Sequence, residues 1–111
     1  MNNSIRRSTL SHIFLKNKLK VAVLGGGSWA TALIKIITEN KRKVGWYIRK
    51  DINIEFIKTN HHNPNYISST SLNTKRLKIS SNINEVIVDA DILIIAIPSA
   101  FISSEFAKID T

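Results

Sequence analysis

The sequence predicts an α/β protein built on a parallel sheet, and three observations support this fold class. Short apolar runs typical of buried strands alternate along the chain with segments whose apolar residues recur at helical spacing. A glycine-rich turn joins the first run to the first helical segment. The last run, residues 91–97, is apolar without alternation, as in a parallel strand covered on both faces. Since parallel strands need crossover helices, which are almost always right-handed, we expect a Rossmann-type sheet of about four strands with helices on both faces.

The first strand is expected at residues 20–24, which lead directly into the turn Gly25-Gly26-Gly27. The first glycine allows a tight reversal, and Gly27 lets the backbone approach phosphates without a side chain in the way. The helix that follows presents unpaired N–H groups and its positive dipole end to an anion. With Ala30 as the third small residue, this pattern predicts a diphosphate site. The alternative is a glycine turn that merely connects a strand to a helix.

The helix after the turn is predicted from Trp29, Leu33, Ile36 and Ile37, which recur at helical spacing. Two interpretations of Trp29 stay open, a ligand contact or a packed position on the inner face of this helix.

The end of this helix has no glycine. Residues 40–43 carry cations, which the helix dipole favours at a C-terminus. Either Lys41 or Asn40 is expected to adopt the left-handed conformation that ends the helix, at a cost of about 1 kcal/mol for Lys41.

Residues 44–48 contain the β-branched and aromatic side chains typical of a second strand. Asp51 follows as the expected N-cap of a short helix with Ile52 and Phe56 on one face. The polar residues 60–71, rich in helix and strand breakers, predict a loop.

The last elements begin with a third strand at 77–80, where apolar and polar residues alternate. Asn82 and Glu85 have the spacing of a capping box and start another helix. The inner face of that helix is expected to consist of Ile83, Val86, Ile87 and Ala90. Pro98 ends the fourth strand, and residues 99–108 form a final helix.

Composition limits the classes of function. The net charge is +8, but eleven of the 16 Lys and Arg lie in residues 1–50, so the sequence does not predict a basic surface designed for nucleic acid. Cysteine is absent, which excludes disulfides and suits a reducing cytosol. The three histidines lack ligand spacing, so we expect no metal site. No apolar run approaches the length of a membrane span.

The chain of 111 residues is long enough for one domain with a core, whereas a complete doubly wound dinucleotide domain usually needs more. We expect residues 1–18 to be a basic, disordered extension. Residues 19–111 are expected to form the N-terminal part of a dinucleotide-binding domain, with a C-terminal substrate domain absent.

Four motifs together resemble one enzyme family. They are the Gly-Gly-Gly-Ser-Trp-Ala-Thr-Ala-Leu of 25–33, the Trp-Tyr-Ile-Arg of 46–49, the Asn-Pro-Asn-Tyr-Ile of 63–67 and the Ala-Asp-Ile-Leu-Ile-Ile-Ala-Ile-Pro-Ser of 90–99. In this order and spacing, residues 19–107 resemble the soluble NAD(P)-dependent glycerol-3-phosphate dehydrogenases, and the tryptophan directly after Ser28 is the most specific element.

The resemblance implies hydride transfer between dihydroxyacetone phosphate and sn-glycerol 3-phosphate with NAD(P)H, feeding glycerophospholipid synthesis. Seven cofactor-binding positions carry over from the family by this resemblance. Gly25, Gly27, Ser28 and Trp29 would hold the diphosphate, Arg49 would meet the adenosine ribose, and Pro98 and Phe101 would border the nicotinamide end. Pro98 has the alternative of being only a strand terminator.

The end of the second strand bears on the choice of cofactor. NAD-specific sites usually place Asp or Glu there to bind the ribose 2′-OH, whereas an arginine accommodates a 2′-phosphate. Here Arg49 and Lys50 occupy the position, and Asp51 follows only afterwards. The sequence therefore favours acceptance of NADPH. In the alternative, Arg49 stacks on adenine or points to solvent.

The resemblance also implies what this chain lacks. The family's catalytic lysine and its helical substrate domain lie beyond the fourth strand, so we assign no catalytic residue and expect the chain alone to be inactive. A phosphorylated substrate, a homodimer and a cytoplasmic location are implied for the full-length protein. The alternatives are a non-catalytic dinucleotide-binding module and a fragment of another Rossmann dehydrogenase.

Overall fold

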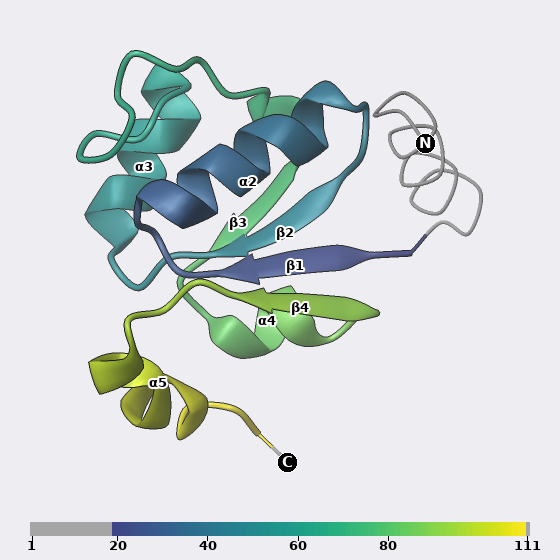
Figure 1. Ribbon diagram of the computed structural model, residues 1–111, viewed down its shortest axis with the longest axis vertical. Helices are drawn as coiled ribbons and strands as arrows, with labels where there is room; N and C mark the ends of the chain where they lie inside the picture. The colour runs from purple at the N-terminus through teal and green to yellow at the C-terminus, as the bar shows by residue number, and fades with distance from the viewer. Residues whose placement is uncertain (1–18, 111) are drawn as a thin grey trace, which may run out of the picture.

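The computed structural model describes residues 19–110, and a four-stranded parallel sheet lies at its centre (Figure 1). The strands are β1 (Val21–Leu24), β2 (Val44–Tyr47), β3 (Leu77–Ser80) and β4 (Ile92–Ile95). Their order is β3-β2-β1-β4, and every neighbouring pair is parallel. The chain thus builds the sheet in one direction to β3 and then returns to the other side of β1. The predicted fold class is confirmed, while the extension 1–18 lies outside the described residues.

Helices cover both faces of the sheet. On one face, α2 (Ser28–Glu39) and α3 (Asp51–Asn60) enclose the larger core with alternate residues of β1 and β2, among them the fully buried Trp46. On the other face, α4 (Ile83–Ile87) packs on the intervening residues Ala22, Leu24 and Tyr47. The final helix, α5 (Ser99–Phe106), lies beyond the end of β4 (Figure 1). A 3₁₀ turn, Thr74–Arg76, precedes β3.

The inner face of α2 differs from the sequence prediction. Trp29 and Ile36 are 80% and 57% exposed, so the interpretation of Trp29 as a core residue is wrong. The buried residues of the helix are Ala30, Thr31, Ile34 and Thr38. The two threonines donate their hydroxyls to the carbonyls four residues earlier, which satisfies these buried polar groups within the helix turn. A polar residue can therefore occupy an inner position that an apolar pattern misses.

The end of α2 follows the predicted geometry. Asn40 is the C-cap with an ordinary negative φ, and Lys41 adopts the left-handed conformation with φ of 59°. Of the two residues considered, Lys41 is the one that ends the helix.

The start of α3 differs from the prediction by one residue. Lys50 is the N-cap and makes no side-chain capping bond, while Asp51 is the first helical residue. The buried face of the helix consists of Ile54 and Ile57, and Ile52 on the other face is 76% exposed.

The start of α4 matches the sequence more closely. Asn82 is its N-cap and accepts a hydrogen bond from the backbone N–H of Asn84 at 3.0 Å. Glu85 accepts from the Ser80 hydroxyl at 2.9 Å, so the reciprocal half of the capping box is replaced by a bond to the end of β3.

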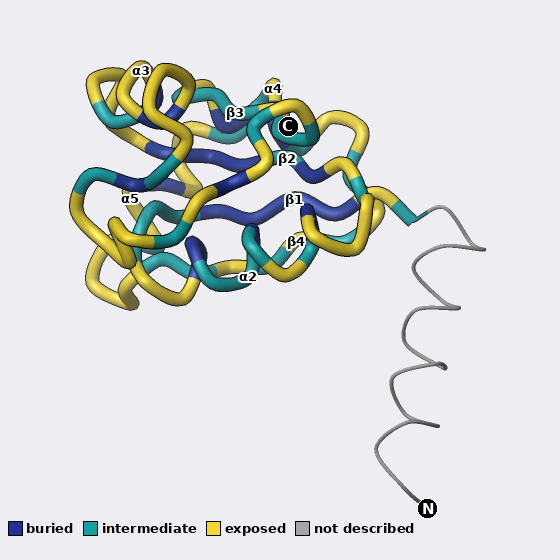
Figure 2. Tube along the Cα trace, turned by 90° about the horizontal axis from the view of Figure 1, so that it is seen from above, coloured by how far each residue is buried: buried dark blue, intermediate teal, exposed yellow. Residues whose placement is uncertain are grey.

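The fourth strand corrects one prediction. We expected β4 to be covered on both faces, but among the described residues it pairs only with β1 and forms an edge of the sheet. Ile92 and Ile94 pack against the larger core, whereas Leu93 and Ile95 are 42% and 47% exposed. Figure 2 shows this contrast between the buried central strands and the partly exposed edge.

Candidate functional site

A cleft of about 810 Å³ opens at the carboxyl ends of β1, β2 and β4. The strand order reverses between β1 and β4, and open α/β sheets bind ligands in the crevice at such a point. The seven sequence-predicted positions all line this one cleft. They are Gly25, Gly27, Ser28, Trp29, Arg49, Pro98 and Phe101.

The glycine turn forms the floor of the cleft, and its glycines meet different demands. Gly25 has φ of 124°, and a Cβ there would lie 2.3 Å from the carbonyl oxygen of Ala96, just past the end of β4. Only glycine fits this position. A Cβ on Gly27 would meet no atom within 4 Å among the described residues, so the space above it is open to a ligand.

Most backbone amides from the turn to the first residues of α2 have no acceptor among the described residues. Gly25 donates its N–H to the carbonyl of Tyr47, and Thr31 donates to the carbonyl of Gly27. Within the described part of the chain, the N–H groups of residues 26–30 between them have no acceptor. The first amides of a helix are left unpaired by its geometry, and together with the helix dipole they attract an anion.

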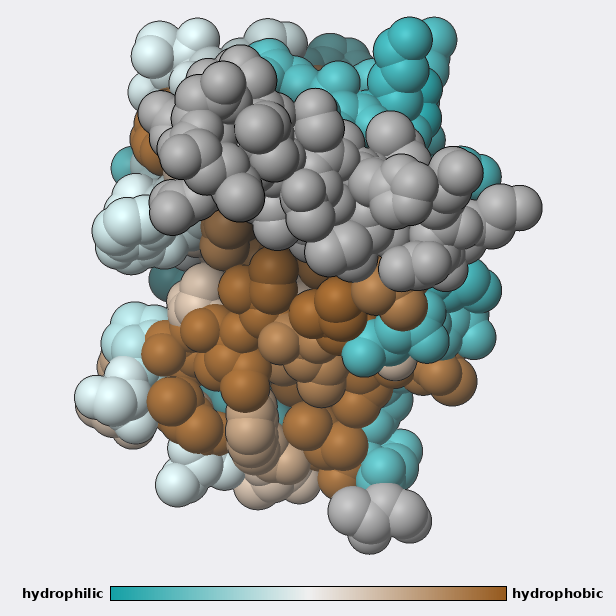
Figure 3. All heavy atoms as spheres, turned by 45° about the vertical axis from the view of Figure 1, so that its right-hand side comes forward, coloured by the Kyte–Doolittle hydropathy of each residue, from teal (hydrophilic) through white to brown (hydrophobic). Residues whose placement is uncertain are grey.

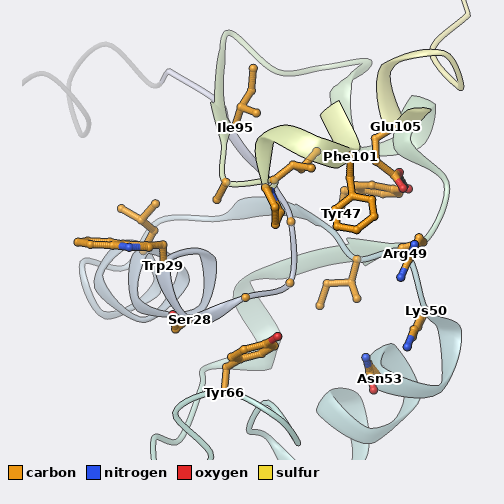
Figure 4. Close-up of a pocket in the computed structure, with 18 of the residues that line it drawn as sticks. Ser28, Trp29, Tyr47, Arg49, Lys50, Asn53, Tyr66, Ile95, Phe101 and Glu105 are labelled. Carbon is orange, nitrogen blue, oxygen red and sulfur yellow. Dashed lines mark hydrogen bonds between the residues drawn. The ribbon is translucent and has the colours of Figure 1, made fainter. Parts of the chain in front are cut away.

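Cations gather at the end of β2, on the side of the cleft away from Trp29 (Figure 4). Arg49, Lys50 and the amide side chain of Asn53 line the cleft there. Asp51 is absent from the lining, and its carboxylate accepts a hydrogen bond from the hydroxyl of Ser81. The end of β2 therefore offers this cleft positive charge and hydrogen-bond donors without the neighbouring carboxylate.

Aromatic side chains border the cleft. Phe101 and Tyr66 are 50% and 46% exposed, and Figure 4 shows their rings on opposite sides of the glycine turn. Exposed rings beside a cleft offer flat apolar surface to the rings of a ligand. In Figure 4, Trp29 lies at the start of α2, on the opposite side of the view from Arg49, and its side chain is largely exposed.

A polar cluster of Tyr47, Glu105 and Lys108 joins α5 to the sheet. The Tyr47 hydroxyl donates to the carboxylate of Glu105, which is only 5% exposed, and Lys108 Nζ lies 3.1 Å from both carboxylate oxygens. Burial alone would raise the pKa of Glu105. Hydrogen bonds from Tyr47 and Lys108, with the positive charges of Lys108 and Arg49, lower that pKa below its ordinary value. The cluster thus holds an ionised carboxylate at the border of the cleft.

Several lining residues were missed by the sequence analysis, among them Tyr66, Asn53, Tyr47 and Glu105. Tyr66 lies within the Asn-Pro-Asn-Tyr-Ile motif, so the sequence carries a signal for this residue. Asn53 lines the cleft because it lies in the first turn of α3, which begins shortly after β2 ends. Nothing in the local sequence indicates that Glu105 bonds to Tyr47, because the two residues lie far apart along the chain.

Comparison with known proteins shows the family of the chain. A family model described as the N-terminus of NAD-dependent glycerol-3-phosphate dehydrogenase matches residues 20–111. The chain belongs to this glycerol-3-phosphate dehydrogenase family. The match begins just before β1 and includes every residue that lines the cleft.

Proteins similar in sequence to this chain are also named glycerol-3-phosphate dehydrogenase. It is 37% identical over 92 residues to glycerol-3-phosphate dehydrogenase (NAD(P)+) of Macrococcus caseolyticus, covering 83% of this chain and 27% of that protein. It is 38% identical over 81 residues to the Bacillus subtilis enzyme of that name, covering 72% of this chain and 23% of the relative. The chain therefore spans about a quarter of the length of these glycerol-3-phosphate dehydrogenases.

A solved structure supports the fold. The crystal structure of glycerol-3-phosphate dehydrogenase from Coxiella burnetii matches with a TM-score of 0.69 at 22% identity, over 84% of this chain and 30% of that one.

In the described part of the chain, no helix is long and apolar enough to cross a membrane, and no group of three or more potential metal ligands gathers.

Proposed function

We propose that this chain is the cofactor-binding part of a glycerol-3-phosphate dehydrogenase and that it binds NAD(P)H across the cleft. The row of backbone amides at residues 26–30, at the head of α2 and beside the open space over Gly27, carries this proposal. A diphosphate bridge needs several N–H donors and room for close approach, and this turn supplies both.

The remaining residues match a dinucleotide that lies along the cleft. Ser28 and Trp29 flank the diphosphate at the start of α2, and Arg49 meets the adenosine ribose at the end of β2. Pro98 and Phe101 border the nicotinamide end, where β4 leads into α5. When bound, the nicotinamide supplies or accepts a hydride, and this part of the chain orients it by fixing the diphosphate.

The activity of the longer protein is inferred from family membership. We propose that it interconverts dihydroxyacetone phosphate and sn-glycerol 3-phosphate, because its relatives bear the name of that dehydrogenase. A cytoplasmic location, a homodimer and a supply of product for glycerophospholipid synthesis belong to the same proposal.

The charge at the end of β2 favours NADPH over NADH. The ribose 2′-phosphate of NADPH would meet Arg49 and Lys50, while the carboxylate of Asp51 is engaged by Ser81. A cation near a phosphate stabilises it, whereas NAD-specific sites place a carboxylate beside the ribose hydroxyls.

Titration of the chain with NADPH and with NADH, followed by backbone NMR, tests both parts of this proposal. We expect the amide signals of residues 25–30 to shift with either cofactor, and NADPH to bind more tightly. Lys50→Gln should weaken NADPH more than NADH. Lys58→Gln changes a lysine in the last turn of α3, the helix that Lys50 precedes, and serves as the matched control because Lys58 does not line the cleft. The chain alone should not oxidise glycerol 3-phosphate. Amide shifts at other residues, with no shift at residues 25–30, contradict the proposed site. Binding of NADH at least about tenfold tighter than NADPH contradicts the NADPH preference.

A further inference from the structure

The three carbonyl oxygens of the glycine turn are each held by a donor from a different part of the protein. The Trp46 indole N–H donates to the carbonyl of Gly25 at 2.6 Å. The side-chain amide of Asn63 donates to the carbonyl of Gly26 at 3.1 Å. The carbonyl of Gly27 accepts from both the N–H and the hydroxyl of Thr31, at 3.0 and 2.8 Å.

These bonds determine where the amides of the turn point. In a planar trans peptide the C=O of one residue and the N–H of the next are directed oppositely, and none of the described peptide bonds is cis. Holding the carbonyls of residues 25–27 toward the protein therefore directs the N–H groups of residues 26–28 away from it. Those three amides are among the ones that lack an acceptor within the described residues.

Asn63 connects this arrangement to the loop beyond α3. It is 2% exposed and uses its full hydrogen-bonding capacity. Its amide group donates to Gly26 and, at 3.0 Å, to the hydroxyl of Thr31, while its side-chain oxygen accepts from the backbone N–H groups of Asn65 and Tyr66. One side chain thus ties the glycine turn to the loop that places Tyr66 at the cleft.

We propose that Asn63 and Thr31, with Trp46, are positioning residues that fix the peptide planes of the glycine turn and so aim the amides of residues 26–28 at the cofactor diphosphate. This inference rests on the proposed function. Glycines are the most freely rotating residues, so an unrestrained turn would have to order its peptide planes on binding. The hydrogen bonds from Asn63, Thr31 and Trp46, here called the clamp, order these peptide planes before the ligand binds. The clamp also keeps the negative ends of three carbonyl dipoles away from the phosphates.

Threonine provides a matched pair of variants within one helix. Thr31 and Thr38 are both buried, and each donates its hydroxyl to the carbonyl four residues earlier. Thr31→Val removes a donor to Gly27 and an acceptor for Asn63, whereas Thr38→Val removes a bond to Ile34, far from the turn. We expect similar loss of thermal stability in both variants. Only Thr31→Val should weaken NADPH binding, by about three- to tenfold, the loss expected for the one hydrogen bond that this variant removes from a carbonyl of the turn.

Asn63 allows a second, sharper comparison. Asn63→Asp keeps the oxygen that accepts from Asn65 and Tyr66 but loses both donated bonds, one to the Gly26 carbonyl and one to the Thr31 hydroxyl. The affinity for NADPH should fall by at least about tenfold, since a buried carbonyl also loses its partner. Asn65→Asp places the same charge at the cleft lining without touching the turn, and it should cost much less affinity.

Amide hydrogen exchange in the ligand-free chain separates positioning from general stability. Residue-resolved NMR should show faster exchange at residues 26–28 in Thr31→Val and Asn63→Asp, with the sheet amides unchanged relative to Thr38→Val. Equal NADPH affinity in the Thr31→Val and Thr38→Val variants would overturn the clamp while leaving the proposed function intact. Failure of the unchanged chain to bind NADPH or NADH at residues 25–30 overturns both proposals.

Discussion

Single residues of the glycine turn separate folding from binding. Gly25 has a positive φ, and a Cβ there would clash with the Ala96 carbonyl, whereas a Cβ on Gly27 would meet only open space. We expect Gly25→Ala to lower the free energy of unfolding by more than about 2 kcal/mol, because backbone strain and a steric clash combine. Gly27→Ala should change stability by less than about 1 kcal/mol and yet weaken NADPH binding. Thermal melts and cofactor titrations of the two variants give the comparison.

The two variants should differ in which property they lose, stability in Gly25→Ala and NADPH affinity in Gly27→Ala. Unchanged affinity in a folded Gly27→Ala variant would contradict the approach of phosphates over this residue. A fully stable Gly25→Ala variant would contradict the turn geometry itself.

Glu105 makes a second residue-scale prediction, which concerns pH. Its pKa is lowered from 4.5 in the folded state, so the stability it contributes is present above pH 4.5 and is lost as the pH falls below that value. Burial and the hydrogen bond to Glu105 raise the pKa of Tyr47 above 10.0, and its contribution is lost only at higher pH. We therefore expect Glu105→Gln to be less stable than the unchanged chain at neutral pH, by about 1–3 kcal/mol. The difference should shrink on acidification.

Thermal melts from pH 3 to 7 check this dependence, and Glu39→Gln is its control. Glu39 pairs with Lys35 at 2.8 Å, but its side chain is 61% exposed, so its removal should cost no more than about 0.5 kcal/mol. A Glu105→Gln difference that is constant with pH, or no larger than that of Glu39→Gln, argues against the cluster as a stabilising unit.

At the scale of elements, the sequence predicts which segments are strands and helices better than which of their faces are buried. The periodicity of α2 was correctly detected, but Trp29 and Ile36 face outward while Thr31 and Thr38 face inward. A periodic pattern reports that apolar residues share a face. It does not report that a threonine can satisfy its hydroxyl within the helix and be buried. The coverage of β4 depends likewise on elements elsewhere in the chain, which local composition does not encode.

The end of α2 carries a prediction at this scale. Lys41 holds a left-handed conformation that favours glycine, so Lys41→Gly should raise the free energy of unfolding by up to about 1 kcal/mol. The hydrogen bond from Arg76 to the Lys41 carbonyl is a backbone contact that the substitution retains. Chemical denaturation measures the change.

Lys43→Gly is the matched control for this position. Lys43 lies two residues further on, is exposed and has no positive φ. Glycine there relieves no strain and adds freedom to the unfolded chain, so stability should fall or stay the same. A gain of similar size in both variants would assign the effect to lost positive charge rather than to the backbone.

At the scale of the whole molecule, the site could be predicted because parallel strands bring their carboxyl ends to one edge. Gly25, Arg49 and Pro98 are far apart in sequence, but each follows a strand, and all line one cleft. The contacts that hold this arrangement could not be predicted. Asn63 reaches the glycine turn from a loop whose path depends on the packing of α3, and a polar loop residue gives no sign that it will be 2% exposed.

The free edge of the sheet gives the last prediction. Figure 3 shows hydrophobic side chains gathered on one face of the molecule, and the exposed Leu93 lies on β4, which has no second strand partner among the described residues. An unpaired apolar edge is a template for association, so we expect the chain to self-associate as its concentration rises.

Leu93→Lys should reduce that association, because a charge on an edge strand opposes pairing. Ile52→Lys changes an apolar side chain that is 76% exposed on α3, which contacts β3 at the opposite edge of the sheet, and should leave association unchanged. Sedimentation velocity over a range of concentrations distinguishes these outcomes. A monomer at all concentrations, with a cooperative melt above about 65 °C, would show that the edge is stable without a partner.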